Sequence, residues 1–241
     1  MTPPLFLLDV LPDGELLELT GDEGRHAARV RRLRVGEEVL IGDGRGALAH
    51  CRVTAVATDG LRLAVTRRWF VTAADPRLVV VQAPPKGERA ELAVELMTEL
   101  GVDEIVPWQA ARALARWDAP RAAKALSRWR RAAREATKQS RRAWAPVVTE
   151  LVDTAGVAAR LAAADAAFVL HEAAEEPLAA ATLPVRGEIV LVVGPEGGVA
   201  ESELAAFAAA RPVRLGRSVL RASTAGAAAL AALSVRMARW D

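Results

Sequence analysis

Residues 189–198 read IVLVVGPEGG, a continuous apolar run of strand length that passes directly into a loop of glycine and proline. A strand without alternation of apolar and polar residues is typical of a parallel sheet covered by helices on both faces. Ligands of such sheets bind where strands end in loops, and glycine lets the backbone approach a ligand closely. The loop is not a nucleotide-phosphate loop, because Val199 and Ala200 follow Gly198 in place of a Lys-Ser/Thr pair. The spacing alone favours a binding site no more than an ordinary tight turn.

The rest of the carboxyl-terminal part repeats this pattern of apolar strands separated by helical stretches. Leu92, Leu96 and Leu100 recur at one-turn spacing within residues 89–100, and the later helical stretches are rich in alanine. Strands that alternate with helices predict an α/β domain with a parallel sheet. The further apolar runs of strand length are residues 78–82, 102–107, 167–170 and 213–215.

The first seventy residues have a different rhythm, that of short strands joined by turns. Asp43-Gly44 and Asp59-Gly60 separate the apolar runs, and Asp-Gly pairs favour hairpins. One short helix is expected around residues 24–32. We predict a small β-barrel-like domain over residues 1–70 and an α/β domain over residues 76–241. The expected strands of the first domain are residues 38–41, 47–56 and 61–65.

Charge is strongly segregated along the chain, although its total is small. The 241 residues carry 32 Lys+Arg and 30 Asp+Glu, a net charge of +2. Residues 25–34 hold five arginines and no acid, and residues 112–142 hold eleven cations against Asp118 and Glu135. The remaining residues therefore carry a net charge of −12. Concentrated arginines predict a polyanionic partner, because guanidinium is the side chain best shaped to contact phosphate oxygens.

The second basic stretch contains a long amphipathic helix. At about 100° per residue, Leu126, Trp129, Ala133 and Ala136 fall on one face, which we expect to pack. A charged face opposite is most often simply solvated. Here acids for i,i+4 pairs are nearly absent, so the like charges repel one another unless an anion binds, which favours RNA or another polyanion. The cations of that face are Arg128, Arg131, Arg134, Lys138 and Arg141.

Cysteine and histidine usage excludes several classes of protein. The single cysteine, Cys51, rules out an internal disulfide framework, and the histidines His26, His50 and His171 are too scattered to predict a metal site. No apolar stretch approaches the length of a membrane span, and the first residues show no secretory pattern. We therefore expect a soluble, cytoplasmic protein without a metal or a membrane partner.

A second candidate segment, residues 215–225, combines a strand end, a loop with a glycine and the start of an alanine-rich helix. We expect Ser223 or Thr224 to cap that helix, which would leave backbone N–H groups free for a ligand. Capping without any ligand explains the pattern equally well.

Taken together, these segments resemble the RsmE family. Residues 194–198 follow a strand, Leu215-Gly216 and Val219-Leu220-Arg221 come after them, and Leu170-His171-Glu172 precedes them. Members are knotted SPOUT-class methyltransferases that use S-adenosylmethionine to methylate N3 of a specific uridine in the 16S ribosomal RNA of the small subunit. The resemblance implies a SPOUT-type parallel sheet with a carboxyl-terminal trefoil knot and a PUA-like RNA-binding β-barrel before it. It also implies a homodimer whose active site is completed across the interface.

The resemblance assigns residues to the cofactor pocket, whose backbone groups would hold the adenine and the methionine. The expected cofactor-binding residues are Leu170, His171, Val193, Gly194, Pro195, Glu196, Gly197, Gly198, Leu215, Gly216, Val219, Leu220, Arg221, Thr224 and Ala225.

The resemblance also covers the two basic stretches. His26 to Arg34 resemble the PUA-like domain, and the segment from Glu135 to Pro146 resembles the basic central motif of the family. We expect Arg142 to stabilise negative charge that develops on the uracil oxygens. Glu135 and Gln139 are the other catalytic candidates, and Glu135 could instead be structural. The expected RNA-binding residues are Arg25, Arg29, Arg32, Arg34, Arg128, Arg131, Arg134 and Lys138.

Two positions depart from the family pattern. Ser223 stands where a glutamate is usual, so no role of that acid carries over. Ala200 stands where a serine is usual, and it should lose a capping box with Glu203, an effect of about 1 kcal/mol. The competing hypothesis is an RNA-binding ribosome-assembly factor without catalysis, with the same fold and an eroded cofactor site.

Overall fold

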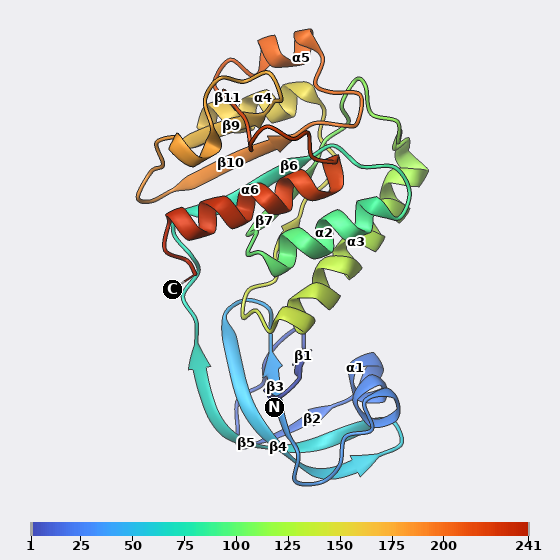
Figure 1. Ribbon diagram of the computed structural model, residues 1–241. Helices are drawn as coiled ribbons and strands as arrows, with labels where there is room; N and C mark the ends of the chain where they lie inside the picture. The colour runs from blue at the N-terminus through green and yellow to red at the C-terminus, as the bar shows by residue number, and fades with distance from the viewer. Residues whose placement is uncertain (1, 241) are drawn as a thin grey trace. The chain divides into compact units, whose positions relative to one another are not determined.

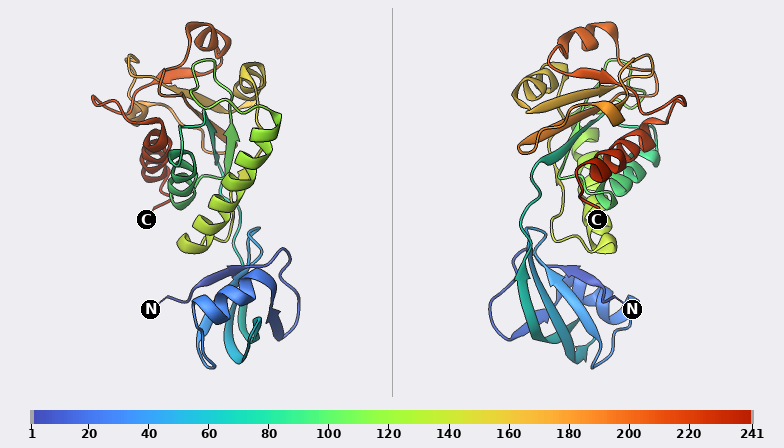
Figure 2. Two further views of the ribbon diagram at one scale, coloured as in Figure 1. Left: turned by 90° about the vertical axis from the view of Figure 1, so that its right-hand side faces the viewer. Right: turned by 60° about the vertical axis from the view of Figure 1, so that its left-hand side comes forward.

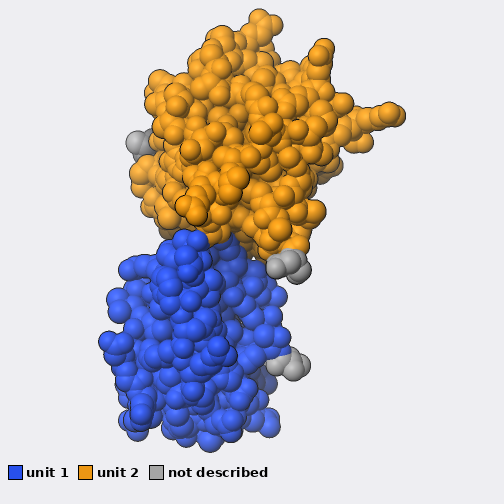
Figure 3. All heavy atoms as spheres, turned by 90° about the vertical axis from the view of Figure 1, so that its left-hand side faces the viewer, with its two compact units in different colours: residues 1–73, 137–145 blue, residues 74–136, 146–241 orange. Residues whose placement is uncertain are grey.

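The computed structural model describes residues 2–240, and the chain divides into two compact units (Figure 1, Figure 3). Unit 1 comprises Met1–Ala73 and Thr137–Ala145, and unit 2 comprises Ala74–Ala136 and Pro146–Asp241. Nothing in the sequence pattern indicated that residues 137–145 belong with the amino-terminal part. The domain limits at residues 1–70 and 76–241 stay a prediction.

Unit 1 is built on a five-stranded sheet with the strand order β1-β3-β4-β5-β2. The β1–β3 pair is parallel and the other neighbours are antiparallel. The two Asp-Gly turns join β3 to β4 and β4 to β5, as expected for hairpins. Strands β1 and β2 were not expected from the sequence, because they are only three and four residues long. The strands are β1 (Leu5–Leu7), β2 (Leu16–Leu19), β3 (Glu38–Gly42), β4 (Ala47–Ala57) and β5 (Gly60–Phe70).

The core of unit 1 forms from the inward-facing residues of these strands. Phe6, Ile41 and Leu63 are fully buried there, together with Cys51. Burial raises the pKa of the Cys51 thiol to about 11, so the side chain behaves as a small hydrophobic group at neutral pH. The expected short helix is present as α1 (Gly21–Arg25), which continues into the π-helical turn η1 (His26–Val30).

Residues 137–145 are attached to unit 1 by hydrogen bonds along their whole length. The Trp144 indole Nε1 donates to the Val71 carbonyl at 2.8 Å, and its ring meets Phe70 edge-on. Backbone N–H groups of Gly46 and Ala145 complete the attachment by donating to the carbonyls of Ala143 and Gly44. The Trp144 ring therefore serves the packing of unit 1.

Unit 2 contains the expected parallel sheet, with six strands in the order β11-β9-β10-β6-β7-β8. The last strand ends at Val213, two residues before the end of the apolar run expected there. The strands are β6 (Arg77–Gln82), β7 (Glu104–Pro107), β8 (Val147–Val148), β9 (Ala166–Leu170), β10 (Glu188–Val193) and β11 (Arg211–Val213). The helices are α2 (Arg89–Glu99), α3 (Ala119–Ser140), α4 (Thr154–Ala163), the 3₁₀ turn η2 (Leu178–Ala180), α5 (Glu201–Ala206) and α6 (Ala222–Arg236).

Both faces of this sheet are covered, which explains its unalternating apolar strands (Figure 2). Leu78 and Val80 of β6 pack in one core cluster with residues of α2, α3 and α6. Val79 and Val81 pack in a second cluster with residues of α4 and residues just after α5. Trp129 of α3 is buried in the first cluster, as the helical pattern predicted. The α/β fold class is confirmed, and the trefoil knot stays a prediction.

None of the helices in the described part of the chain is both long and apolar enough to cross a membrane. No group of three or more His, Cys, Asp or Glu side chains among residues 2–240 is placed to hold a metal ion.

Candidate functional site

Three loops of unit 2 converge on one cavity at the carboxyl ends of its strands. Parallel strands end at the same side of a sheet, so the loops after β9, β10 and β11 must meet there. They line a cavity of about 590 Å³, a size suited to a nucleoside-sized ligand. Apolar side chains such as Leu170, Val193 and Leu215 form part of its wall. We call this cavity the loop pocket.

The loop pocket unites fourteen of the fifteen residues predicted to bind a cofactor. Thr224 is the exception, because it lies inside the first turn of α6 and its hydroxyl donates to the Arg221 carbonyl at 3.2 Å. The expectation that Ser223 or Thr224 caps α6 is wrong. The helix begins at Ala222 after an extended Arg221, and Ser223 is buried within the first turn.

The glycines after β10 shape the floor of the loop pocket. Gly198 has a φ of +75°, a backbone conformation that side chains other than glycine rarely adopt. A Cβ on Gly197 would lie 3.1 Å from the carbonyl oxygen of Arg112, so this glycine permits a close approach between two loops. The glycine loop therefore has a conformational reason for its composition beyond a simple turn.

Charge at the loop pocket is predominantly positive. Four arginines, Arg112, Arg214, Arg217 and Arg221, line it together with Glu172 and Glu196. Within the residues that the structure describes, none of these four guanidinium groups forms an ion pair or a hydrogen bond. Uncompensated cations repel one another, so the pocket mouth favours an anion.

Sequence reasoning missed several of these lining residues, Arg112 above all. Arg112 follows β7, so the rule that ligands bind beyond the carboxyl ends of strands would have included its loop. The sequence there has no glycine to mark a site. Val199 and Arg214 also lie outside the predicted segments, whereas Glu172, Arg217, Ser218 and Ala222 lie within them but were not assigned to the cofactor.

Ala200 and Glu203 form half of a capping box at the start of α5. The Ala200 side chain cannot accept a hydrogen bond, but a Glu203 oxygen accepts the Ala200 N–H at 2.9 Å. The predicted loss of the box is therefore only partial. Another Glu203 oxygen accepts the N–H of Ala111 at 2.7 Å, so this side chain joins two loops. Glu196 accepts the N–H of Lys86 at 3.3 Å, which ties the glycine loop to the segment after β6.

The three predicted catalytic residues lie on α3 and just beyond it. Glu135 is exposed on the part of α3 that belongs to unit 2, whereas Gln139 and Arg142 belong to the segment of unit 1. Arg141 ends the helix in a left-handed conformation with φ +55°. The N–H groups of Arg141 and Arg142 donate to the carbonyls of Lys138 and Thr137, which is a Schellman motif and fixes the backbone of Arg142.

The predicted RNA-binding residues of unit 1 differ in how accessible their side chains are to an RNA. Arg25 pairs with Asp22, and the Arg29 Nε donates to the Thr58 carbonyl at 2.9 Å. Arg32 and Arg34 are exposed. Lys138 forms a 2.8 Å ion pair with Glu23 in which its side chain is only 12% exposed, so it contributes to the packing of unit 1.

The basic face of α3 within unit 2 is mostly accessible. Arg128 and Arg131 are exposed, and Arg134 is half-buried. Arg128 forms an ion pair with Glu91 of α2 at 3.2 Å, an exposed contact worth well under 1 kcal/mol. An incoming phosphate can therefore compete for this arginine.

The α/β fold with a loop pocket at the carboxyl ends of its parallel strands matches the class of RNA methyltransferases. A family model described as an RNA methyltransferase domain matches residues 73–234, and one described as an RNA methyltransferase PUA domain matches residues 19–65. The chain belongs to the ribosomal RNA small subunit methyltransferase E family, which confirms the resemblance read from its motifs.

The individual similarities extend over nearly whole chains. Ribosomal RNA small subunit methyltransferase E of Mycobacterium tuberculosis is 50% identical over 100% of this chain and 95% of its own length. The structure of the corresponding Neisseria gonorrhoeae protein bound to S-adenosyl methionine has a TM-score of 0.88 at 26% identity, with 98% of each chain covered. A methyltransferase of Legionella pneumophila in complex with the same cofactor has a TM-score of 0.84 at 27% identity, with 97% of each chain covered.

Proposed function

We propose that this chain is an S-adenosylmethionine-dependent methyltransferase that methylates N3 of a specific uridine in the 16S ribosomal RNA of the small subunit. The observation that carries the proposal is the convergence of residues 170–172, 194–198 and 214–221 on one cavity. The relatives whose names include ribosomal RNA small subunit methyltransferase support the class of substrate. Action on ribosomal RNA is also the reason to expect the protein in the cytoplasm.

The residues of the loop pocket fit the cofactor. Gly194, Gly197 and Gly216 leave backbone groups of the loops unobstructed by side chains, and Leu170 and Leu215 supply apolar walls for an adenine ring. S-adenosylmethionine supplies an electrophilic methyl group on a sulfonium ion. The chain itself must exclude water, hold the cofactor in one conformation and present the uridine in line with that methyl group.

Arg142 is our candidate for the electrostatic part of the reaction. Loss of the N3 proton places negative charge on the two carbonyl oxygens of uracil, and a guanidinium can stabilise it by donating a hydrogen bond to one of them while N3 stays open to the methyl group. The Schellman motif at the end of α3 fixes the backbone of this residue, which favours a preorganised role. Glu135 and Gln139 precede it on α3; Glu135 is a candidate to orient a neighbouring group or to accept the proton, and Gln139 is a candidate to orient the uracil through hydrogen bonds.

Association into a homodimer is part of the proposal. Val219 and Leu220 stand beside the loop pocket with exposed side chains, and Leu114 is 66% exposed. Large exposed apolar side chains close to a site favour a protein contact there. Light scattering should return a mass of two chains.

The function is tested by what the protein does to ribosomal RNA. Purified 16S ribosomal RNA and assembled small subunits from a strain lacking the protein are incubated with enzyme and cofactor, and the nucleosides are analysed by mass spectrometry. The expected product is 3-methyluridine at one position. Methylation of another base or another atom would contradict the proposed specificity.

Arg142→Ala separates catalysis from binding. If Arg142 stabilises charge in the transition state, kcat falls by about a hundredfold or more, as when one oxyanion-stabilising donor is removed. Calorimetry should give an unchanged cofactor affinity. Methylation at the wild-type rate with unchanged cofactor affinity would remove this role from Arg142.

The alternative of a non-catalytic assembly factor predicts RNA binding without cofactor binding. Titration of the dimer with S-adenosylmethionine decides between the two. No detectable heat or thermal stabilisation at millimolar cofactor would favour the alternative.

A further inference from the structure

A buried carboxylate lies directly behind the glycine loop and contacts three separate segments of unit 2. The Glu203 side chain accepts hydrogen bonds from the N–H of Ala111 at 2.7 Å, the N–H of Ala200 at 2.9 Å and the Thr154 hydroxyl at 3.3 Å. Glu203 is 3% exposed, and no cation pairs with it within the part of the chain that the structure describes. A buried carboxylate held only by neutral donors is costly to place, so its three hydrogen bonds point to a positioning role.

The segment that Glu203 holds is the loop after β7, next to the loop pocket. Its hydrogen-bond partner Ala111 immediately precedes Arg112, and Ala113 is buried on the other side. Gly197 faces the backbone of Arg112 so closely that a Cβ would lie 3.2 Å from the Arg112 Cβ. The backbone of Arg112 is thus fixed from two sides, by the Glu203 carboxylate and by the glycine loop.

The backbone of Arg112 is fixed, but its side chain is not held by other described residues. It is exposed and lines the loop pocket, and among residues 2–240 no carboxylate or carbonyl accepts a hydrogen bond from its guanidinium. Because the backbone of Arg112 is already fixed, only its side chain, and not the loop, has to be ordered when a ligand binds.

We infer that Glu203 is a positioning residue that holds Arg112 at the mouth of the loop pocket, where the Arg112 guanidinium binds a phosphate of the substrate RNA. The inference rests on the proposed function for the identity of the substrate. Guanidinium presents a planar set of donors that matches phosphate oxygens. Arg112 is exposed, so a macromolecule can reach its guanidinium.

The cofactor carboxylate is the competing anion, and the charge of the loop pocket argues against it. S-adenosylmethionine carries one carboxylate together with two cationic groups, a sulfonium and an ammonium. Four arginines against two glutamates is an excess of positive charge that a polyanion complements better.

The test uses the full-length protein and two readouts. Filter binding to purified 16S ribosomal RNA without cofactor gives the RNA affinity, and calorimetry gives the affinity for S-adenosylmethionine. We expect Arg112→Ala to weaken RNA binding about tenfold and to leave cofactor affinity within about twofold. The matched control is Arg186→Ala, which removes an exposed arginine outside the loop pocket and should leave both affinities unchanged.

Glu203 is tested through its coupling to Arg112. Glu203→Ala should weaken RNA binding about fivefold, and the double variant should bind RNA no more weakly than Arg112→Ala alone. Glu203→Gln keeps the volume and one acceptor oxygen, so it should restore part of the RNA affinity. If Glu203 had a merely structural role, the effects of Glu203→Ala and Arg112→Ala on the free energy of RNA binding would add. If Glu203→Ala does not fold, the same test is made with Glu203→Gln, by comparing the RNA affinities of the two single variants with that of the double variant.

Three outcomes would overturn the inference. They are unchanged RNA affinity in Arg112→Ala, a loss of cofactor affinity in that variant with RNA affinity retained, and full additivity in the double variant. Failure of the proposed function has a different signature, since wild-type protein would then bind RNA without transferring a methyl group. The RNA affinities would still decide the role of Arg112.

Discussion

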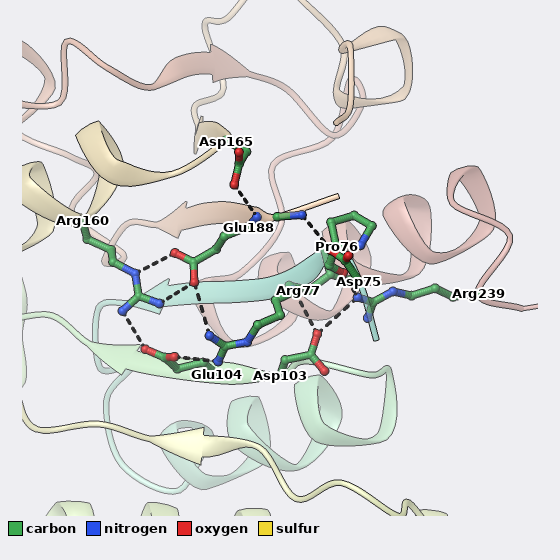
Figure 4. A network of polar contacts seen from close by, with 11 residues as sticks. Asp75, Pro76, Arg77, Asp103, Glu104, Arg160, Asp165, Glu188 and Arg239 are labelled. Atoms are coloured by element: carbon green, nitrogen blue, oxygen red, sulfur yellow. Dashed lines mark hydrogen bonds and ion pairs between the residues drawn. The ribbon is translucent and has the colours of Figure 1, made fainter. Parts of the chain in front are cut away.

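The two ends of the parallel sheet in unit 2 use the same residue types in opposite ways. At the amino ends of β6, β7 and β10, Arg77, Arg160, Glu104 and Glu188 form an alternating network of ion pairs (Figure 4). At the carboxyl ends, the arginines of the loop pocket have no such partners in the described part of the chain. Paired charges stabilise the fold, whereas unpaired charges are available to a ligand.

Arg160 is the centre of the network at the amino ends. It donates two hydrogen bonds to Glu188 and one to Glu104, each at 2.8 Å. Hydrogen bonding to Glu188, with a further contribution from Glu104, raises the pKa of Arg160 above its usual value. The guanidinium therefore keeps its charge between the two carboxylates.

Hydrogen bonds from the backbone extend the network at this end. Asp165 accepts the N–H of Glu188 at 2.8 Å, and Asp75 accepts the N–H of Gly187 at 2.7 Å. Asp103 accepts the N–H of Leu78 and pairs with Arg239 of the carboxyl-terminal segment (Figure 4). The starts of β6 and β10 are thus held by carboxylates. The loops at the other end are held by glycine geometry and by Glu203.

The largest effect on stability is expected from breaking the network. Arg160→Met removes one of the two described cations that Glu104 and Glu188 share, and it leaves Arg77 to compensate both carboxylates. Because these groups are only partly exposed, we expect the free energy of unfolding to fall by about 2–3 kcal/mol, somewhat less than for a fully buried pair. Urea unfolding followed by circular dichroism measures the change.

Arg160 lies at the amino ends of the strands, so Arg160→Met should leave the loop pocket at the carboxyl ends intact. Cofactor affinity, measured well below the unfolding transition, should stay within about twofold of the wild type. A loss of cofactor affinity with full stability would show that the two ends of the sheet are not separate. Arg186→Ala, an exposed arginine without a partner among the described residues, is the control and should change stability by less than about 0.5 kcal/mol.

An intermediate effect is expected from two glycines with similar backbones at opposite ends of the sheet. Gly198 of the glycine loop and Gly101 before β7 have φ values of +75° and +93°, and both have open space around a new Cβ. Alanine in this conformation costs about 1–2 kcal/mol, so both substitutions should lower the free energy of unfolding by a similar amount. Only Gly198→Ala should also weaken cofactor binding, by about tenfold. Equal cofactor affinities in the two variants would contradict the assignment of the glycine loop.

The parts of this architecture that the sequence predicted are those set by local pattern. The continuous apolar runs of β6, β9 and β10 predicted a covered parallel sheet, and that topology brings their loops together. Two Asp-Gly turns predicted the hairpins of unit 1. In each case the signal lies within a few consecutive residues, or follows from the rule that parallel strands end on one side of a sheet.

The parts that could not be predicted depend on contacts between distant segments. Arg112 reaches the loop pocket because Glu203, about ninety residues later, holds its backbone. The first turn of α6 includes Ser223 because the chain stays extended through Arg221, which overrides the capping preference of serine. Residues 137–145 look like the end of α3 in sequence but join unit 1, since Trp144 finds its partners there.

The smallest effect on stability, and the sharpest test of the comparison, is expected from Arg217→Ala. Arg217 is exposed at the loop pocket and has no ion pair among the described residues, so its removal should change the free energy of unfolding by less than about 0.5 kcal/mol. RNA affinity should fall, and the slope of log K against log salt should become shallower by about 0.7, the value for one phosphate contact with a single strand. Arg77→Ala, which removes a paired cation at the amino end, should show the reverse: lower stability and an unchanged salt slope. If Arg217→Ala destabilised the fold while the salt slope stayed the same, its charge would be structural and the distinction between the two ends would fail.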